Sequence, residues 1–154
     1  MVRQVGPSNA KWQVRAAGDF TMTSQRKSEL DVVIKRLNAN DPRMADLSMA
    51  WTAMGDWGIE ALSDVIKVNT VLTTLDLYQN DIGPMGASAL ARALRKNYTL
   101  SVVNMDLNNI GDEGCLEIIE TLGRHNTSLT KLSLANNHVN HITLASLNQL
   151  LERN

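Results

Sequence analysis

One repeated pattern constrains the fold of this chain more than any other feature. Residues 72–83 read L-x-x-L-x-L-x-x-N-x-I-G, a run of spaced apolar residues followed by an asparagine and a glycine. The same frame recurs at residues 100–111 and 129–139, and a methionine-rich version occupies residues 44–55. The four copies begin at residues 44, 72, 100 and 129, which are 28, 28 and 29 residues apart. Copies that stay in phase at such a spacing indicate a chain built from structural repeats.

The second half of each repeat has a helical period. Apolar residues recur there at spacings of three and four, which places them on one face of a helix. The aligned apolar columns are Ile59/Ala87/Cys115, Leu62/Leu90/Ile118 and Ile66/Leu94/Leu122. A strand, a turn and a full helix in every repeat resemble the leucine-rich repeats of ribonuclease inhibitor. The resemblance implies an α/β fold, namely a right-handed leucine-rich-repeat solenoid with the arc of a horseshoe. Its parallel strands would line the concave face and its helices the convex face.

A helix is expected ahead of the first repeat, over residues 24–40. Its apolar stripe consists of Leu30, Val33, Ile34 and Leu37. Asp41-Pro42 follows at the point where the helix must end, because the residue before a proline is pushed out of the helical region. A repeat stack leaves an apolar surface at each end, so we predict that this helix caps the N-terminal end. The predicted organisation is a poorly ordered arm at 1–23 and a leucine-rich-repeat domain at 24–154.

The two ends of the chain carry separate expectations. In the N-terminal arm, Trp12, Val14 and Phe20 fit a short strand or a contact with the first repeat. At the other end, residues 152–154 align with residues 95–97 and 124–126, so the sequence stops where a fifth strand would begin. This predicts an open last repeat that either continues in a longer array or is covered by a partner or a second copy of the chain.

Several polar residues recur with the repeats. Asparagines in the turn after the strand are expected to bond the backbone of the neighbouring repeat, and these are Asn80, Asn108 and Asn137. Asparagines at the helix ends are expected to adopt the left-handed conformation of a C-cap, and these are Asn69, Asn97 and Asn126. Asp56 and Asp112 stand where the N-caps of their own helices belong.

Residues between the leucines of each strand are expected to point out from the concave face. Reading across the repeats places Trp51, Tyr78 and Leu107 in an apolar and aromatic patch, with Gln79 beside them. Asp46, Asp76 and Asp106 lie on a diagonal that makes the centre of this face acidic and suited to a basic partner. Aromatic residues of this kind anchor protein interfaces. The alternative is that Trp51 packs under the N-terminal segment and that the aspartates are simply solvated.

Composition restricts the function further. Fifteen basic and 16 acidic residues give no electrostatic basis for nucleic-acid binding. A single cysteine, Cys115, excludes an internal disulfide framework, and no apolar run is long enough for a membrane span, so a cytoplasmic location is expected. Cys115 lies in a core column and is expected to be inert. His138 and His141 have no third metal ligand close in sequence. We therefore expect no metal, no cofactor and no enzymatic activity.

A narrower resemblance concerns the tropomodulin and leiomodin family. Residues 34–44, I-K-R-L-N-A-N-D-P-R-M, resemble the helix and N-D-P turn that open the leucine-rich domain of that family. Residues 67–75, K-V-N-T-V-L-T-T-L, resemble a later strand entry there. The resemblance implies actin binding at filament pointed ends.

The sequence thus predicts a non-enzymatic protein-interaction module that uses the concave face. The predicted contact residues are Trp51, Asp76, Tyr78, Gln79, Asp106 and Leu107. The first alternative is a tropomodulin-like actin-binding regulator of the cytoskeleton. The second is a structural element that assembles, for example as a homodimer, through its open C-terminal repeat.

Overall fold

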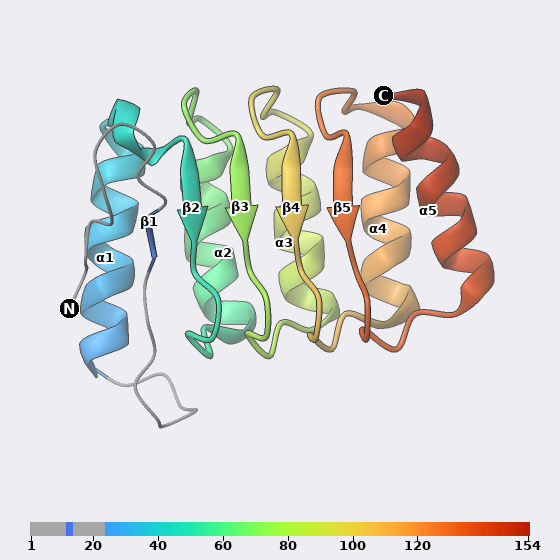
Figure 1. The fold of residues 1–154 in the computed structure, drawn as a ribbon, viewed down its shortest axis with the longest axis horizontal. Coiled ribbons are helices and arrows are strands. Elements are labelled where there is room, and N and C mark those ends of the chain that lie inside the picture. Colours follow the sequence, from blue (N-terminus) through green and yellow to red (C-terminus); the bar gives the residue numbers. More distant parts are fainter. Residues whose placement is uncertain (1–11, 14–23) are drawn as a thin grey trace.

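The computed structural model describes residues 12–13 and 24–154. Its sheet has five parallel strands in sequence order, which are β1 (Trp12–Gln13), β2 (Asp46–Ser48), β3 (Thr74–Asp76), β4 (Val102–Asn104) and β5 (Lys131–Ser133). Helices α2 (Gly55–Ile66), α3 (Pro84–Leu94), α4 (Gly111–Arg124) and α5 (His141–Arg153) follow the last four strands. The strands form one layer and the helices lie behind them (Figure 1). The predicted α/β class with a parallel sheet is confirmed.

The core lies between the two layers and is built from the repeated apolar positions. The central residues of β2, β3 and β4 are Leu47, Leu75 and Val103, and each is at most 1% exposed. They occupy the same register, so equivalent side chains of successive repeats stack in columns. Methionines at positions 44, 49 and 54 replace leucines in the first repeat and are equally buried, since an unbranched side chain adapts to this space.

The first helix of the described chain, α1 (Ser24–Asn38), contributes Leu30, Val33 and Leu37 to this core. It ends slightly earlier than predicted, because Asn40 adopts a left-handed conformation with φ of 50° and the Asp41 amide bonds the Arg36 carbonyl at 3.1 Å. A 3₁₀ turn, η1 (Pro42–Met44), follows. Arg43 donates to the Asp41 carboxylate through its guanidinium and its backbone N–H, and both bonds lower the pKa of Asp41 to about 2.

Within the predicted N-terminal arm, residues 12–13 form β1, which pairs in parallel with β2. A short strand against the first repeat, one of the two arrangements expected for Trp12, is therefore present. Val14, Phe20 and the remainder of 1–23 lie outside the described residues.

The turn asparagines bond the neighbouring repeat as predicted. The Asn108 side chain accepts from the N–H groups of Asn80 and Ile82, at 2.9 and 3.0 Å, and donates to the Leu77 carbonyl at 3.0 Å. Asn80 makes the corresponding bonds to the first repeat, where the Thr52 hydroxyl donates to Asn80 Oδ1 at 2.6 Å. This ladder satisfies buried backbone groups at each junction.

The asparagines at the helix ends form a second ladder, and the prediction that they are left-handed C-caps is wrong. Asn69, Asn97 and Asn126 are at most 3% exposed, and none has a positive φ. The Asn97 amide donates to the carbonyls of Ile66 and Asn69, while its Oδ1 accepts from the N–H of Leu100 at 2.8 Å. The amide group thus joins the preceding repeat to the start of the next strand, so no left-handed turn is needed to satisfy these groups.

The prediction that Asp56 and Asp112 cap their own helices is also wrong. Asp56 Oδ1 accepts from the N–H groups of Gly83 and Gly86, at 2.7 and 2.9 Å, and therefore caps α3 of the next repeat. Asp112 accepts from the Asn140 N–H at the start of α5. A Cβ at Gly86 would lie 2.5 Å from Asp56 Oδ1, so glycine is what allows this close approach.

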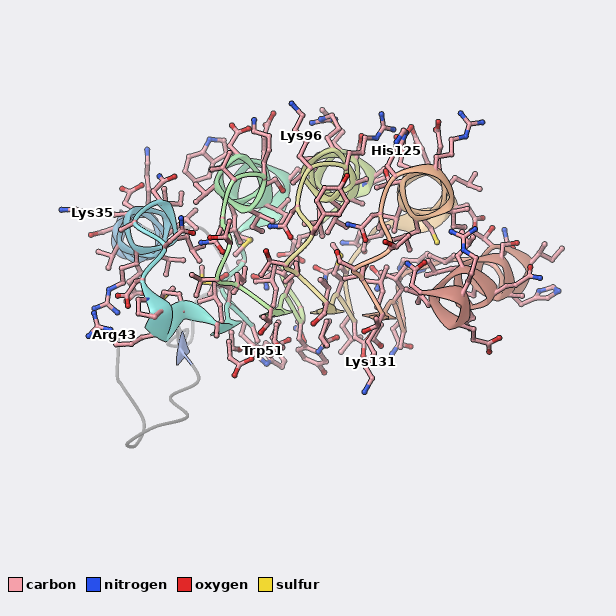
Figure 2. All side chains as sticks on the ribbon, turned by 90° about the horizontal axis from the view of Figure 1, so that it is seen from above. Lys35, Arg43, Trp51, Lys96, His125 and Lys131 are labelled. Carbon is pink, nitrogen blue, oxygen red and sulfur yellow. The ribbon has the colours of Figure 1, made fainter. Side chains whose placement is uncertain are left out.

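The C-terminal helix differs in placement from the others, because α5 lies nearer to the level of the sheet than α2, α3 and α4 (Figure 2). Its Leu147 is buried, and the Asn154 side chain extends the second ladder by donating to the carbonyls of Asn126 and Leu129. The last repeat is therefore less open than the sequence predicts, although Leu132 of β5 is only partly buried.

Candidate functional site

The side of the sheet that faces away from the helices is here called the strand face, and it presents the two outward-pointing residues of each strand. Trp51 and Lys131, which lie on and beside this sheet, both point away from the helices (Figure 2). The registers place Asp46, Thr74, Val102 and Lys131 in one row. Ser48, Asp76, Asn104 and Ser133 form the other. Both rows agree with those predicted from the repeat spacing.

The aromatic part of the strand face is a pair. Trp51 and Tyr78 have ring centroids 5.5 Å apart and an interplanar angle of 51°, a tilted geometry that aromatic rings favour. The Trp51 N–H also bonds the Tyr78 carbonyl at 3.0 Å. Trp51 is 43% exposed, so much of its ring remains available for contact. Two of the predicted contact residues are thus brought together, and the predicted aromatic patch contains at least this pair.

A row of left-handed residues follows the strands. Trp51, Gln79, Leu107 and Asn136 occupy the same position in successive repeats and have φ values of 63°, 48°, 55° and 57°. This conformation is sterically unfavourable for residues other than glycine and asparagine. Leu107 is 38% exposed, so its apolar side chain has neither a buried seat nor a relaxed backbone.

The two aspartates of the predicted site are held by neutral donors. Asp76 accepts from the Ser48 hydroxyl and the Asn104 amide, both at 3.0 Å, and from the Tyr78 N–H at 3.2 Å. Asp106 accepts from the Ser133 hydroxyl and from the Ala135 N–H. Because hydroxyl and amide donors carry no net charge, the strand face keeps the negative charge of both carboxylates. It also fixes their direction, in contrast to the simple solvation considered from the sequence.

The sequence analysis missed the partners that orient these aspartates. Ser48 and Asn104 flank Asp76 on the adjacent strands, one repeat before and one repeat after it. The spacing of 28 residues placed all three in one row, and the signal available was that each can donate a hydrogen bond to a carboxylate.

Other residues considered from the sequence lie elsewhere. Trp57 is on α2, where Lys27 Nζ of α1 lies 5.3 Å from its ring centroid. Cys115 is fully buried, and burial, with a smaller effect of the Asp112 charge, raises its thiol pKa to about 11. His138 and His141 belong to no metal-binding group, since the described residues bring no three His, Cys, Asp or Glu side chains together in that way.

Comparison with known proteins agrees with the repeat architecture. The sequence profile of the leucine-rich repeat matches residues 68–91, 96–118 and 125–141. No curated protein sequence matches the chain. No helix in the described part of the chain has the length and apolar character to cross a membrane.

Two solved structures are similar over most of the chain. The actin-binding site 2 of leiomodin-1 is 26% identical, with a TM-score of 0.68, and the match covers 81% of this chain and 73% of that one. The C-terminal domain of tropomodulin from Caenorhabditis elegans is 16% identical, with a TM-score of 0.64 over 81% of this chain and 92% of that one, and shows the shared fold alone. The chain therefore carries leucine-rich repeats and resembles leiomodin and tropomodulin, as predicted.

Proposed function

We propose that this leucine-rich-repeat chain is a non-enzymatic protein-interaction module that binds its partner with the strand face. The observation that carries the proposal is the exposed Trp51–Tyr78 pair, which lies beside the hydrogen-bonded carboxylate of Asp76. Aromatic anchors next to oriented polar groups are the usual composition of an interface hot spot. The contact surface comprises Trp51, Asp76, Tyr78, Gln79, Asp106 and Leu107.

Actin is the partner that the comparisons favour. The leiomodin-1 structure is an actin-binding site, and it matches 81% of this chain at 26% identity. The strand face carries two fixed carboxylates, so it would bind a basic region of a partner. Binding to actin would place the protein in the cytoplasm, with the cytoskeleton.

Actin binding can be tested with one double variant and a matched control. Trp51→Ala with Tyr78→Ala removes the aromatic pair, whereas Tyr98→Ala removes a 64% exposed tyrosine that follows α3. Co-sedimentation with filamentous actin and binding to actin monomers should both be measured. We expect the double variant to bind at least tenfold more weakly, because truncating a hot-spot residue costs 2 kcal/mol or more.

The controls separate the two parts of this proposal. Equal binding by the native chain and by a still-folded double variant would exclude the strand face as the actin contact. If actin is not bound at all, the same two baits should be used to capture proteins from a cell lysate. A protein retained by the native chain and by Tyr98→Ala, but lost from the double variant, would then identify the partner.

A second candidate function is assembly through the C-terminal end of the array. Leu132 of β5 and Val139 after it are only partly buried, whereas Leu75 and Ile82 at the equivalent positions are fully buried. Covering this apolar surface would favour association with another chain. Light scattering over a wide concentration range tests the idea, since the molar mass should rise with concentration. A constant monomer mass would reject assembly and leave the strand-face proposal unaffected.

A further inference from the structure

The helix layer has a groove of its own, on the side of the molecule opposite the strand face. It has a volume of about 360 Å³ and lies between residues of α2, α3 and α4. Its lining includes two large apolar side chains, Trp57 and Met85, which are 51% and 77% exposed. Apolar side chains gathered in a groove, rather than scattered singly, are typical of interaction sites.

The rim of this groove is acidic. Glu60 of α2 and Glu113 and Glu117 of α4 line it. Within the described part of the chain, none of these three carboxylates makes a side-chain hydrogen bond or an ion pair. The one basic residue of the lining is Arg92, whose Nη1 donates to Ser88 Oγ at 3.0 Å. The groove therefore combines apolar anchors with an excess of uncompensated negative charge.

One contact shows which chemistry this surface accepts. Lys27 of α1 reaches over the Trp57 ring, with Nζ 5.3 Å from the centroid. A cation in this position is attracted by the electron-rich face of the indole, and nearby carboxylates strengthen the attraction. An ammonium group of the chain itself thus already lies at one end of the groove.

We propose that this groove is a second docking site, which binds a basic amphipathic segment of a partner protein. An apolar residue of that segment would contact Trp57 and Met85, and its lysines or arginines would face Glu60, Glu113 and Glu117. Charge complementarity selects this occupant, since an acidic segment would be repelled and a neutral one would leave the carboxylates unpaired. Amphipathic helices bind to grooves of this kind through apolar residues three and four positions apart. Because the strand face is on the other layer, the chain could bind two partners at once.

A defined peptide tests the proposal with the full chain. The probe is a fluorescently labelled helical peptide of leucines and lysines, with the leucines on one face, and binding is followed by fluorescence anisotropy. Glu113→Lys with Glu117→Lys should weaken binding at least tenfold. Met85→Ser, which leaves every charge in place, should also weaken it severalfold. Binding by the native chain should fall as salt rises, since exposed charges are screened.

Matched controls distinguish a groove from general electrostatic attraction. Asp31→Lys with Glu152→Lys changes the net charge equally at two exposed positions outside the groove, and should alter affinity less than twofold. The strand-face variant Trp51→Ala with Tyr78→Ala should bind the peptide normally, whatever its effect on actin. Equal weakening by the two charge variants would overturn the proposal. So would equal binding of a control peptide in which serines replace the leucines, or no binding of the amphipathic peptide at low salt.

Discussion

At the scale of single residues, Leu107 combines two unfavourable features. Its backbone has a φ of 55° and its side chain is 38% exposed. Asn136 occupies the same turn position in the last repeat with nearly the same φ, and asparagine tolerates this conformation much better than leucine. Strain retained at an exposed apolar residue is a pattern found at functional sites, where it is offset by the rest of the fold.

The strain at Leu107 can be released by substitution. Leu107→Asn should raise the free energy of unfolding by about 1 kcal/mol, since the left-handed backbone costs most residues about that much. The same change should weaken binding to the partner of the strand face, because it removes an apolar contact. Urea denaturation and the actin measurement report these two effects separately.

Leu107→Ala provides the control, because alanine removes the apolar side chain without relieving the backbone. It should weaken binding and leave stability nearly unchanged. A stability gain in the alanine variant equal to that in the asparagine variant would show that exposure, rather than φ, was the unfavourable feature.

The arrangement of the strand face was largely predictable, because a strict repeat spacing fixes which residues are neighbours across strands. Asp76, Tyr78 and Leu107 were assigned to this face from spacing alone. The bonds of Asp76 to Ser48 and Asn104 were not predicted, since hydrogen bonding depends on side-chain rotamers that a pattern does not specify.

At the scale of elements, the helices are linked through their N-termini. Asp56 at the start of α2 satisfies two N–H groups at the start of α3, and Asp112 in α4 does the same for the Asn140 N–H before α5. Pro84 stands at the equivalent place in α3, so the junction between α3 and α4 lacks this carboxylate. Rules for capping consider a helix and its own flanking residues, which is why the sequence assigned both aspartates to the wrong helix.

Removal of the Asp56 carboxylate should therefore destabilise α3 rather than α2. We expect Asp56→Ala to lower the free energy of unfolding by about 1 to 2 kcal/mol, the usual cost of losing an N-cap. Hydrogen exchange should increase at the amides of Gly83 and Gly86, which lose their acceptor. Asp56→Asn keeps an acceptor oxygen and should cost less than half as much.

Asp64→Ala is a suitable comparison, because Asp64 is an exposed residue of α2 whose only printed partner in the described chain is Lys67, at 3.3 Å. It should change stability by less than about 0.5 kcal/mol. Faster exchange at the start of α2 instead of α3 would contradict the cross-repeat assignment.

At the scale of the whole molecule, the repeats are joined by two asparagine ladders that run in the same direction. The turn asparagines link each repeat to the one before it on the side of the strand ends, and the helix-end asparagines do so at the strand entries. The first ladder was predictable because the turn asparagine is part of the repeat signature. The second was not, since an asparagine at a helix end has a familiar local role that the sequence alone favours. Interactions between neighbours in such an array determine how cooperatively it unfolds.

The middle of the first ladder is the place to test this coupling. Asn108→Ala would leave the buried N–H groups of Asn80 and Ile82 without acceptors and the Leu77 carbonyl without a donor. An unsatisfied buried group costs about 1 to 3 kcal/mol, so this single change should lower the free energy of unfolding by about 3 kcal/mol or more. The dependence of that free energy on urea should also become shallower, because two halves of the array that unfold separately each expose less surface.

Asn154→Ala is the matched change at the end of the array, where the side chain donates two bonds of 3.2 and 3.1 Å to carbonyls of the preceding repeat. It should cost about 1 kcal/mol and leave the urea dependence unaltered, since no repeat beyond it is described. Urea unfolding followed both by circular dichroism and by the fluorescence of the tryptophans, which report on the N-terminal half, would separate the two cases. In Asn108→Ala the two signals should no longer coincide. Coincident transitions and equal costs for both variants would mean that the apolar columns, rather than the ladder, transmit cooperativity from repeat to repeat.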